Sequence, residues 1–345
     1  MKDETMPNPS YLDDRIAINK QRRRSIIVTS LVICLIILLP ALVEQRFYRN
    51  IMTLVFLWGA MAGAWNILGG YAGKFSLGNA AFFGTGAYTS SILFVKFGIS
   101  PWLGMVVGIL ISVSLALLLG IITLRLKGKF FALCTIAFAM LMEIAAVHLR
   151  DLTAGAEGLL IPWKPGITNM LFENDLTWVY VVMIFMLIVY FSCRYLETSR
   201  IGYSWSALRG NEDAAEALGI STLKAKLSAF AISAAFTSAG GTLYAQYSMF
   251  IEPIYVFGLE LSTQLALYAI IGGMGSAVGP MIGAAVITPL EIFLRSSFPE
   301  MASGASLAMY ALILILVVLF LPQGFVVGFR NIFKKFGRLV TGKTA

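Results

Sequence analysis

The sequence is poor in charge and almost without histidine, and both shortages restrict what it can do. Charged residues make up 13% of the 345 residues, against about 25% in a soluble domain. Hydrophobic residues make up 58%, and the mean hydropathy is +0.82. These values exclude an ordinary water-soluble domain. The one histidine, His148, cannot build a metal site alone, so neither a metal nor a cofactor is expected.

Cysteine is also scarce. Cys34, Cys134 and Cys193 each fall within an apolar run, at spacings that match no CxxC motif. We interpret them as small buried hydrophobic residues rather than as disulfide partners or metal ligands. No other pattern of catalytic side chains is present, so the sequence predicts a protein that is not an enzyme.

Long apolar runs are what the sequence has in place of these features. About ten runs are long enough for a helix to cross a hydrocarbon core of about 30 Å. Because the runs are continuous rather than alternating, they favour helices over a β-barrel. The sequence therefore predicts an all-α integral membrane bundle of about ten transmembrane helices. Two runs, 76–95 and 257–274, are rich in glycine or polar residues and are the weakest predicted spans, which either cross fully, re-enter or break. The predicted spans are 26–43, 51–69, 76–95, 102–123, 130–148, 178–194, 227–248, 257–274, 277–294 and 305–321.

Basic residues cluster between these runs, as the positive-inside rule requires of cytoplasmic segments. The net charge of +8 comes from these clusters, which lack the interleaved aromatics of a nucleic-acid surface, so lipid and not nucleic acid is expected around them. The pattern predicts that both termini are cytoplasmic. It gives a cytoplasmic N-terminal segment 1–25, a transmembrane domain 26–325 with a cytoplasmic loop 194–226, and a basic cytoplasmic tail 326–345. Span 26–43 is too long for a signal-peptide core and is expected to be retained.

Two loops are longer than connectors need to be. The outer loop, about 149–177, is rich in glycine and proline; it can cap a pore mouth, bind a partner, or be inert. The inner loop, 194–226, contains a short predicted helix with Asn211 as its N-cap and Gly219 near its end. That helix is either a docking element or an exposed connector.

One motif is misleading. Residues 337–344 fit the phosphate-binding pattern GxxxxGK[ST]. This pattern binds phosphate only between a strand and a helix, and the apolar runs leave no room for such an α/β domain. We interpret the match as accidental, which means that any ATP hydrolysis belongs to another subunit.

The inner loop resembles a known transport motif. Asp213-Ala214-Ala215 followed by Gly219 resembles the cytoplasmic EAA loop of ATP-binding-cassette importer permeases, with Asp in the Glu position and without the usual Ile-x-Leu-Pro continuation. The resemblance implies that the loop contacts an ATPase subunit. The coupling residues it implies are Glu212, Asp213, Ala214, Ala215, Glu216 and Gly219.

A wider resemblance names the family. Residues 70–88, GYAGKFSLGNAAFFGTGAY, resemble the signature of branched-chain amino acid permeases of the LivM type. Further similar segments follow in the family's order, at 125–133, 152–159, 271–280 and 321–324. Lys74 and Asn79 stand where relatives often carry Gln and His, which leaves a urea or amide permease as the alternative. An ion-driven secondary transporter is a third, weaker reading.

The resemblance implies a permease subunit that moves branched-chain or related hydrophobic amino acids across the bacterial inner membrane. Its expected partners are a homologous second permease, two ATPase subunits and an extracytoplasmic binding protein.

Polar residues inside the spans are the candidates for substrate contact, since such residues usually face a bundle interior. Glu143 can contact a substrate amine or pair with another buried group, and Glu291 is a second intramembrane acid. The glycine-rich signature can line the pore or pack helices closely. The pore or substrate candidates are Gly73, Ser76, Asn79, Thr85, Glu143 and Gln264.

A faint internal repeat accompanies the signature. Residues 69–73 and 272–275 are both glycine-rich and enter spans from the same side. A duplicated ancestor and the general frequency of glycine in membrane helices explain this equally well.

Overall fold

The structure is a computed structural model that describes residues 37–126 and 129–297, together with positions 311, 312, 315, 319, 324 and 325. Most of the predicted span 26–43, nearly all of 305–321 and the segments 1–25 and 326–345 lie outside the described residues. The chain divides into two units, Met1–Arg49 and Asn50–Ala345. In the first, residues 37–42 are helical and Arg49 Nε donates a 2.7 Å hydrogen bond to the Val43 carbonyl.

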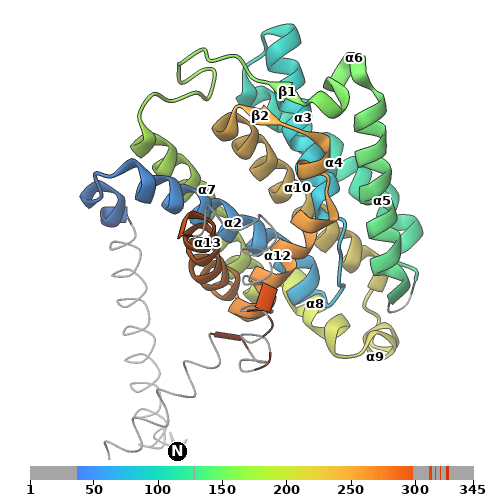
Figure 1. Ribbon diagram of the computed structural model, residues 1–345. Coiled ribbons are helices and arrows are strands. Elements are labelled where there is room, and N and C mark those ends of the chain that lie inside the picture. The colour runs from blue at the N-terminus through green and yellow to red at the C-terminus, as the bar shows by residue number, and fades with distance from the viewer. Residues whose placement is uncertain are drawn as a thin grey trace, which may run out of the picture. The chain divides into compact units, whose positions relative to one another are not determined.

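The second unit is almost entirely helical (Figure 1). A π-helical turn, η1 Ile67–Tyr71, continues α2. The other principal elements are α2 Arg46–Asn66, α3 Asn79–Phe97, α4 Pro101–Thr123, α5 Lys129–His148, α7 Asp175–Thr198, α8 Arg200–Gly210, α9 Glu212–Ala217, α10 Thr222–Ser248, α12 Leu259–Gly272 and α13 Gly279–Ser297.

Five helical segments of the described chain are long and apolar enough to cross a membrane. This establishes a helical membrane protein and agrees with the predicted fold class at that level. Helices α3 and α10 also occupy predicted spans, although their glycine and hydroxyl residues lower their hydropathy. The five segments are Arg46–Tyr71, Pro101–Thr123, Lys129–His148, Asp175–Thr198 and Pro253–Gly272.

The core of the second unit is a triple of helices, α3, α4 and α10, that pack through small residues. A Cβ at Gly104 of α4 would lie 2.8 Å from the Cα of Ser90, and one at Gly108 would lie 3.2 Å from the Cα of Gly86. Backbones this close are typical of small-residue helix packing in membranes. The buried residues of α4 recur about every fourth position and are Pro101, Gly104, Gly108, Ser112, Ala116, Gly120 and Thr123.

The helix is interrupted at the start of the predicted span 257–274. A four-residue helix, α11 Pro253–Val256, ends before Phe257 and Gly258, and α12 then supplies only 14 residues. At a rise of about 1.5 Å per residue, α12 alone spans about 21 Å, less than the full hydrocarbon thickness.

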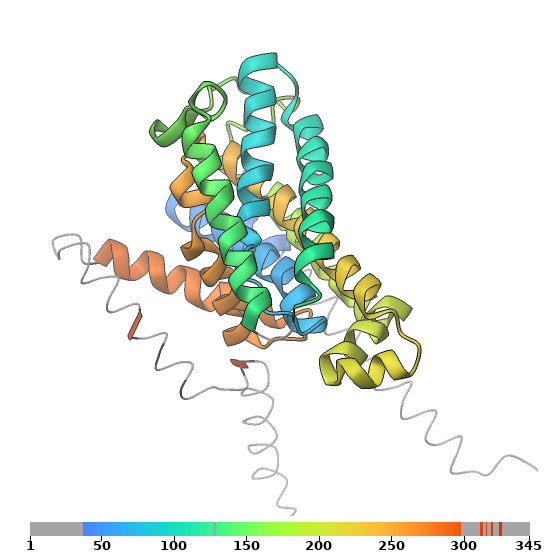
Figure 2. The ribbon, with the colours of Figure 1, turned by 90° about the vertical axis from the view of Figure 1, so that its right-hand side faces the viewer.

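The outer loop folds against the segment that precedes α11. Two short strands, β1 Leu159–Leu160 and β2 Phe250–Ile251, pair antiparallel with Leu159 opposite Ile251. A short helix, α6 Arg150–Thr153, and a 3-10 turn, η2 Gly155–Glu157, lead into β1. This β pair and α9 lie at opposite ends of the bundle (Figures 1 and 2), so the two long loops predicted from the sequence occupy opposite faces.

Candidate functional site

The inner loop folds into two helices that attach to the bundle. Trp205 of α8 is fully buried, and its Nε1 donates to the Ala225 carbonyl of α10 at 2.8 Å and to Ser228 Oγ at 3.2 Å. Asn211 caps α9 through a 3.1 Å bond from the Ala214 amide, as the sequence predicted, and Gly219 follows with φ +82°. The loop is therefore attached to the bundle by specific side-chain contacts.

The six coupling candidates of this loop do not share one face. Asp213, Ala214, Glu216 and Gly219 are exposed, whereas Ala215 is 2% exposed and packs toward the helical bundle. Glu212 is half-buried and also faces the bundle. Only the first four are therefore presented for contact with another protein.

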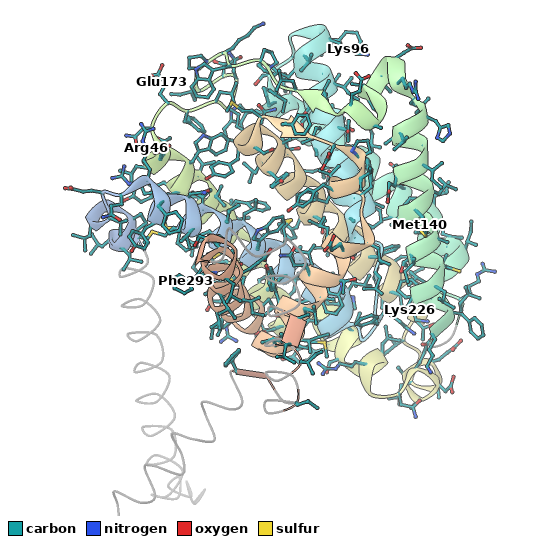
Figure 3. The ribbon with its side chains drawn as sticks, viewed as in Figure 1. Arg46, Lys96, Met140, Glu173, Lys226 and Phe293 are labelled. Atoms are coloured by element: carbon teal, nitrogen blue, oxygen red, sulfur yellow. The ribbon has the colours of Figure 1, made fainter. Side chains whose placement is uncertain are left out.

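Glu212 joins three elements. One carboxylate oxygen accepts from Lys74 Nζ at 2.8 Å, in the signature segment, and the other pairs with Lys226 Nζ of α10. Lys226 is only 4% exposed and also donates to the Leu124 carbonyl, at the end of α4, at 3.2 Å. Figure 3 shows Lys226 beside α9. Partial burial raises the pKa of Glu212, but the hydrogen bonds from Lys226 and Lys74 outweigh it and hold that pKa below its ordinary value.

A second contact runs from α8 to the same glycine-rich region. Arg209 Nη1 donates to the Gly70 carbonyl at 2.8 Å. Gly73 adopts φ +67°, and a Cβ there would lie 3.0 Å from Arg209 Cγ. A left-handed residue without a side chain is therefore required for this close approach. This packing against Arg209 accounts for the glycine at position 73 without any contact to a substrate. Gly73 is otherwise exposed.

The two glycine-rich segments meet at Asn66. Its Nδ2 donates to the Ser276 carbonyl at 3.0 Å, and its Oδ1 accepts from the Gly275 amide at 2.9 Å. The neighbouring Trp65 donates from Nε1 to the Ser76 carbonyl at 2.8 Å. Two adjacent residues of α2 thus hold both irregular segments in place. Their side chains form hydrogen bonds with backbone groups that have no helical partner there.

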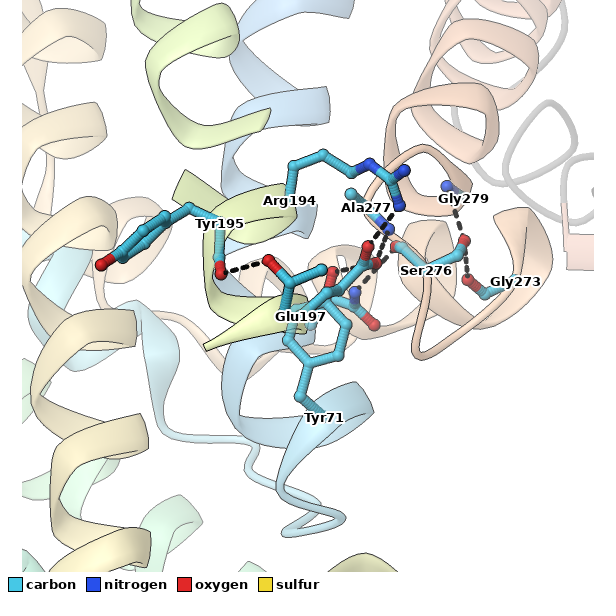
Figure 4. A network of polar contacts seen from close by, with 10 residues as sticks. Tyr71, Arg194, Tyr195, Glu197, Gly273, Ser276, Ala277 and Gly279 are labelled. Atoms are coloured by element: carbon cyan, nitrogen blue, oxygen red, sulfur yellow. Dashed lines mark hydrogen bonds and ion pairs between the residues drawn. The ribbon is translucent and has the colours of Figure 1, made fainter. Parts of the chain in front are cut away.

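Glu197, near the end of α7, ties α2 to the turn before α13 (Figure 4). Its Oε1 accepts from Tyr71 Oη at 2.9 Å and from the Ala277 amide at 2.8 Å. Its Oε2 pairs with Arg194 at 2.7 Å. Together with the Glu212, Arg209 and Asn66 contacts, this makes the end of the bundle that carries α9 a connected polar network.

The signature residues Ser76, Asn79 and Thr85 lie in the packed interior. They are 0%, 1% and 7% exposed. Asn79 Nδ2 lies 3.3 Å from Ser233 Oγ of α10, and Thr85 Oγ1 donates to the carbonyl one turn earlier in its own helix. The amide of Ala80, in the first turn of α3, donates to Ser262 Oγ of α12 at 2.8 Å. These contacts favour the helix-packing interpretation of the signature.

Helix α3 begins deep in the bundle. Ser233, the partner of Asn79, lies 11 residues beyond Thr222, or about 16 Å along α10 at the ordinary helical rise. Residues 72–78, which lead to this buried helix start, form no helix. Irregular backbone within a membrane bundle is tolerated only inside protein or beside a water-filled path.

The intramembrane acids differ in their surroundings. Glu291 of α13 accepts from Gln264 Nε2 of α12 at 3.0 Å, and the same amide nitrogen lies 2.6 Å from Tyr268 Oη. Glu143 is half-buried on α5, one turn beyond the buried Ala139, and no hydrogen bond or ion pair to it is found within the described residues. Met140, one turn before Glu143 on α5, is 53% exposed and is labelled in Figure 3. The structure thus brings Gln264 to Glu291 and leaves Glu143 separate.

Residues 47–321 match the family of permease components of branched-chain amino acid transport systems. The chain belongs to this family. It is accordingly a multi-pass membrane permease and a non-catalytic transport subunit, and the described residues contain no cluster of side chains that could hold a metal ion.

Similar individual proteins include both kinds of permease of that system. The high-affinity branched-chain amino acid permease LivM of Salmonella typhimurium is 28% identical over 298 residues, covering 80% of this chain and 69% of the relative. LivM of Escherichia coli K12 gives the same figures. LivH of Salmonella typhimurium is 24% identical over 300 residues, covering 81% of this chain and 94% of the relative. No solved structure gives a significant match.

Sequence reasoning missed three residues of the polar network in this family member. Glu197, Arg209 and Lys226 all lie in the predicted inner loop 194–226, and none of them was singled out. The one hint that the sequence offered was an acidic and a basic residue near the two ends of the inner loop. Their pairing partners lie far away in sequence, and no local pattern identifies them.

Proposed function

We propose that this permease is one half of the membrane pore of an ATP-driven importer for branched-chain or related hydrophobic amino acids in the bacterial inner membrane. Membership of the family carries the proposal. Relatives named for branched-chain amino acids, rather than for urea or amides, support the cargo. The ion-driven alternative is disfavoured by the same membership and by the scarcity of acidic relay residues in the described spans.

The pore requires partners. The chain resembles LivM and also, more distantly, LivH, which supports a pore built from two homologous permeases. Two ATPase subunits and an extracytoplasmic binding protein complete the proposed complex. About ten spans with both termini cytoplasmic place α9 on the ATPase side and the β1–β2 pair on the binding-protein side.

Helix α9 is the proposed contact for the ATPase. Its exposed residues Asp213, Ala214 and Glu216, with Gly219 after it, form the docking surface. Glu212 and Ala215 belong to the same element but face inward. Movement of the ATPase would therefore reach the permease through a short helix that is attached to the bundle by its own inward-facing residues.

For the translocation path, we propose Gln264 and Glu143 as the substrate-facing candidates of greatest interest. Gln264 is half-buried and holds Glu291, so two polar groups converge from α12 and α13 at intramembrane depth. Ser76, Asn79 and Thr85 are enclosed, and we assign them to holding the helices around the path. Gly73 is assigned to the close approach of Arg209.

The proposal is tested by affinity purification of the chain from its native membrane in mild detergent, with mass spectrometry of what accompanies it. Two ATPase polypeptides and a second permease are expected. Stimulation of ATP hydrolysis in that complex by binding protein loaded with leucine, compared with urea, then identifies the cargo. Reproducible isolation of the chain alone in several detergents would refute the importer, and a response to urea would refute the amino-acid cargo.

A further inference from the structure

Lys226 is the only charged residue among those described whose side chain is buried. A buried ammonium group is costly unless it is paired and hydrogen-bonded. Here it has both kinds of partner: the Glu212 carboxylate, and the carbonyl of Leu124, which caps the end of α4. A cation is favourable at a helix C-terminus, where carbonyl groups are left without partners. Lys226 thus fixes the position of Glu212 against α4 and α10.

Glu212 also contacts the signature segment through its second carboxylate oxygen. Its other oxygen accepts from Lys74 Nζ at 2.8 Å, and the Lys74 side chain is 15% exposed. The two residues lie 138 positions apart in the sequence, so this contact is tertiary. Lys74 is also a position at which the chain departs from the family signature, and the ion pair to Glu212 gives that departure a structural purpose.

Helix α9 is short. It contains six residues, fewer than an isolated helix needs for stability, and Ala215 is its one buried residue. On the other side of the link, Lys74 lies five positions before Asn79, where α3 begins, and the residues between them form no helix. A displacement of α9 would therefore pull on an irregular segment whose far end is the start of a transmembrane helix.

We propose that Glu212 is a positioning residue that connects α9 to the signature segment through Lys74, with Lys226 as its fixed anchor. In this arrangement, movement of α9 shifts residues 74–78 and with them the start of α3. The existence of the link stands on geometry alone. Only its use in transport rests on the proposed function. The lowered pKa of Glu212 is consistent with a carboxylate that remains ionised, and the link closed, at neutral pH.

The link is tested by hydrogen–deuterium exchange of the purified full-length protein, comparing the amides of residues 72–78 with those of 211–220. In Glu212→Gln, exchange in both segments is expected to be about tenfold faster, because a local opening no longer has to break a charge-assisted hydrogen bond. Glu216→Gln removes the same charge from an exposed residue of α9 and should leave both segments unchanged. Faster exchange in 211–220 alone would overturn the proposal.

A second variant keeps the test decisive if Glu212→Gln fails to fold around the buried Lys226. Lys74→Met removes only the contact with the signature segment and leaves the Glu212–Lys226 pair intact. It should accelerate exchange in 72–78 about as strongly while 211–220 stays protected, and unchanged exchange in 72–78 would refute the link. Lys224→Met, an exposed lysine of the same helix as Lys226, serves as the control.

Uptake per ATP hydrolysed in the assembled complex then separates the two proposals. If the link is right and the importer proposal is wrong, exchange responds as described but no ATPase is present to couple. If the importer is right and the link is wrong, Lys74→Met transports normally and its exchange is unchanged. If both are right, Lys74→Met lowers uptake per ATP by about tenfold, the factor that corresponds to one charge-assisted hydrogen bond.

Discussion

At the scale of single residues, this permease depends on a few buried polar side chains whose hydrogen bonds are complete, and it tolerates others whose bonds are not. Asn66 uses both ends of its amide on the segment 272–276. Gln246 is also fully buried, yet neither its oxygen nor its nitrogen has a partner among the described residues. A buried amide side chain stabilises the fold only where it forms hydrogen bonds with groups that would otherwise have no partner.

This contrast predicts opposite outcomes for two amide-to-apolar changes. Asn66→Leu leaves the Gly275 amide and the Ser276 carbonyl unsatisfied and should destabilise the protein by about 2–3 kcal/mol. Gln246→Met removes an amide without partners and should leave stability unchanged or slightly raised. Thermal unfolding of the purified protein in detergent measures both. Equal melting temperatures for the two variants would contradict the assignment.

At the scale of elements, helix contacts in this protein depend on the absence of side chains. A Cβ at Gly86 would overlap the carbonyl oxygen of Ser238 on α10. In a membrane, where lipid is as apolar as leucine, such close backbone approach supplies much of the association between helices. Adding even one methyl group at this crossing therefore separates two helices of the core.

Gly86→Ala should consequently lower stability by about 1–3 kcal/mol, the usual cost of overpacking. Gly210 provides the matched control, because a Cβ there has no atom within 4 Å. Gly210→Ala should be neutral. Unfolding of both variants in the same detergent is the measurement, and a Gly86→Ala protein as stable as the parent would show that α3 and α10 are less tightly packed than described.

Helix α9 supports a second prediction at this scale. Ala214 is exposed and Ala215 is 2% exposed. Ala214→Trp should insert and fold normally but lower uptake per ATP hydrolysed by about tenfold or more, since a large side chain blocks the docking surface. Ala215→Trp should instead destabilise the loop itself by overpacking. Normal uptake per ATP in the Ala214→Trp complex would show that α9 does not dock.

At the scale of the whole molecule, the proposed topology fixes which loops face which compartment. A periplasm-active reporter inserted after Lys164, in the outer loop, should be active, and a cytoplasm-active reporter inserted after Gly210 should be active. These outcomes follow from the distribution of basic residues and from the separation of the two loops to opposite ends of the bundle. The reversed pattern would mean that the orientation in the membrane is opposite to the one proposed, so that α9 would not face the ATPase.

The positions of the long apolar helices could be predicted from the sequence because each is set by a local quantity, the length of an apolar run. Helix α4, predicted at 102–123, is found at Pro101–Thr123, and α5, predicted at 130–148, at Lys129–His148. The N-cap at Asn211 and the helix end near Gly219 were predictable because the residue types at those positions determine them locally. The family was predictable because its signature is a continuous stretch.

The polar network could not be predicted in this way. Whether Glu212 faces an ATPase or the permease depends on where Lys74 and Lys226 lie in space, and sequence position does not give that. Two neighbouring alanines, Ala214 and Ala215, look alike in the sequence, yet one is exposed and the other buried. A six-residue helix has too few turns for hydrophobic periodicity to show its inner face.

The spacing of small residues along α4 also has a consequence for how this sequence can drift over generations. The seam of Gly104, Gly108, Ser112, Ala116 and Gly120 is buried, whereas the opposite side exposes large apolar residues such as Leu103, Leu110 and Leu118. We therefore expect homologous chains to exchange leucine, isoleucine, valine and phenylalanine at the outward positions and to keep glycine, alanine or serine in the seam. Substitution tolerance along α4 should therefore rise and fall with a period of about four residues, close to the helical repeat.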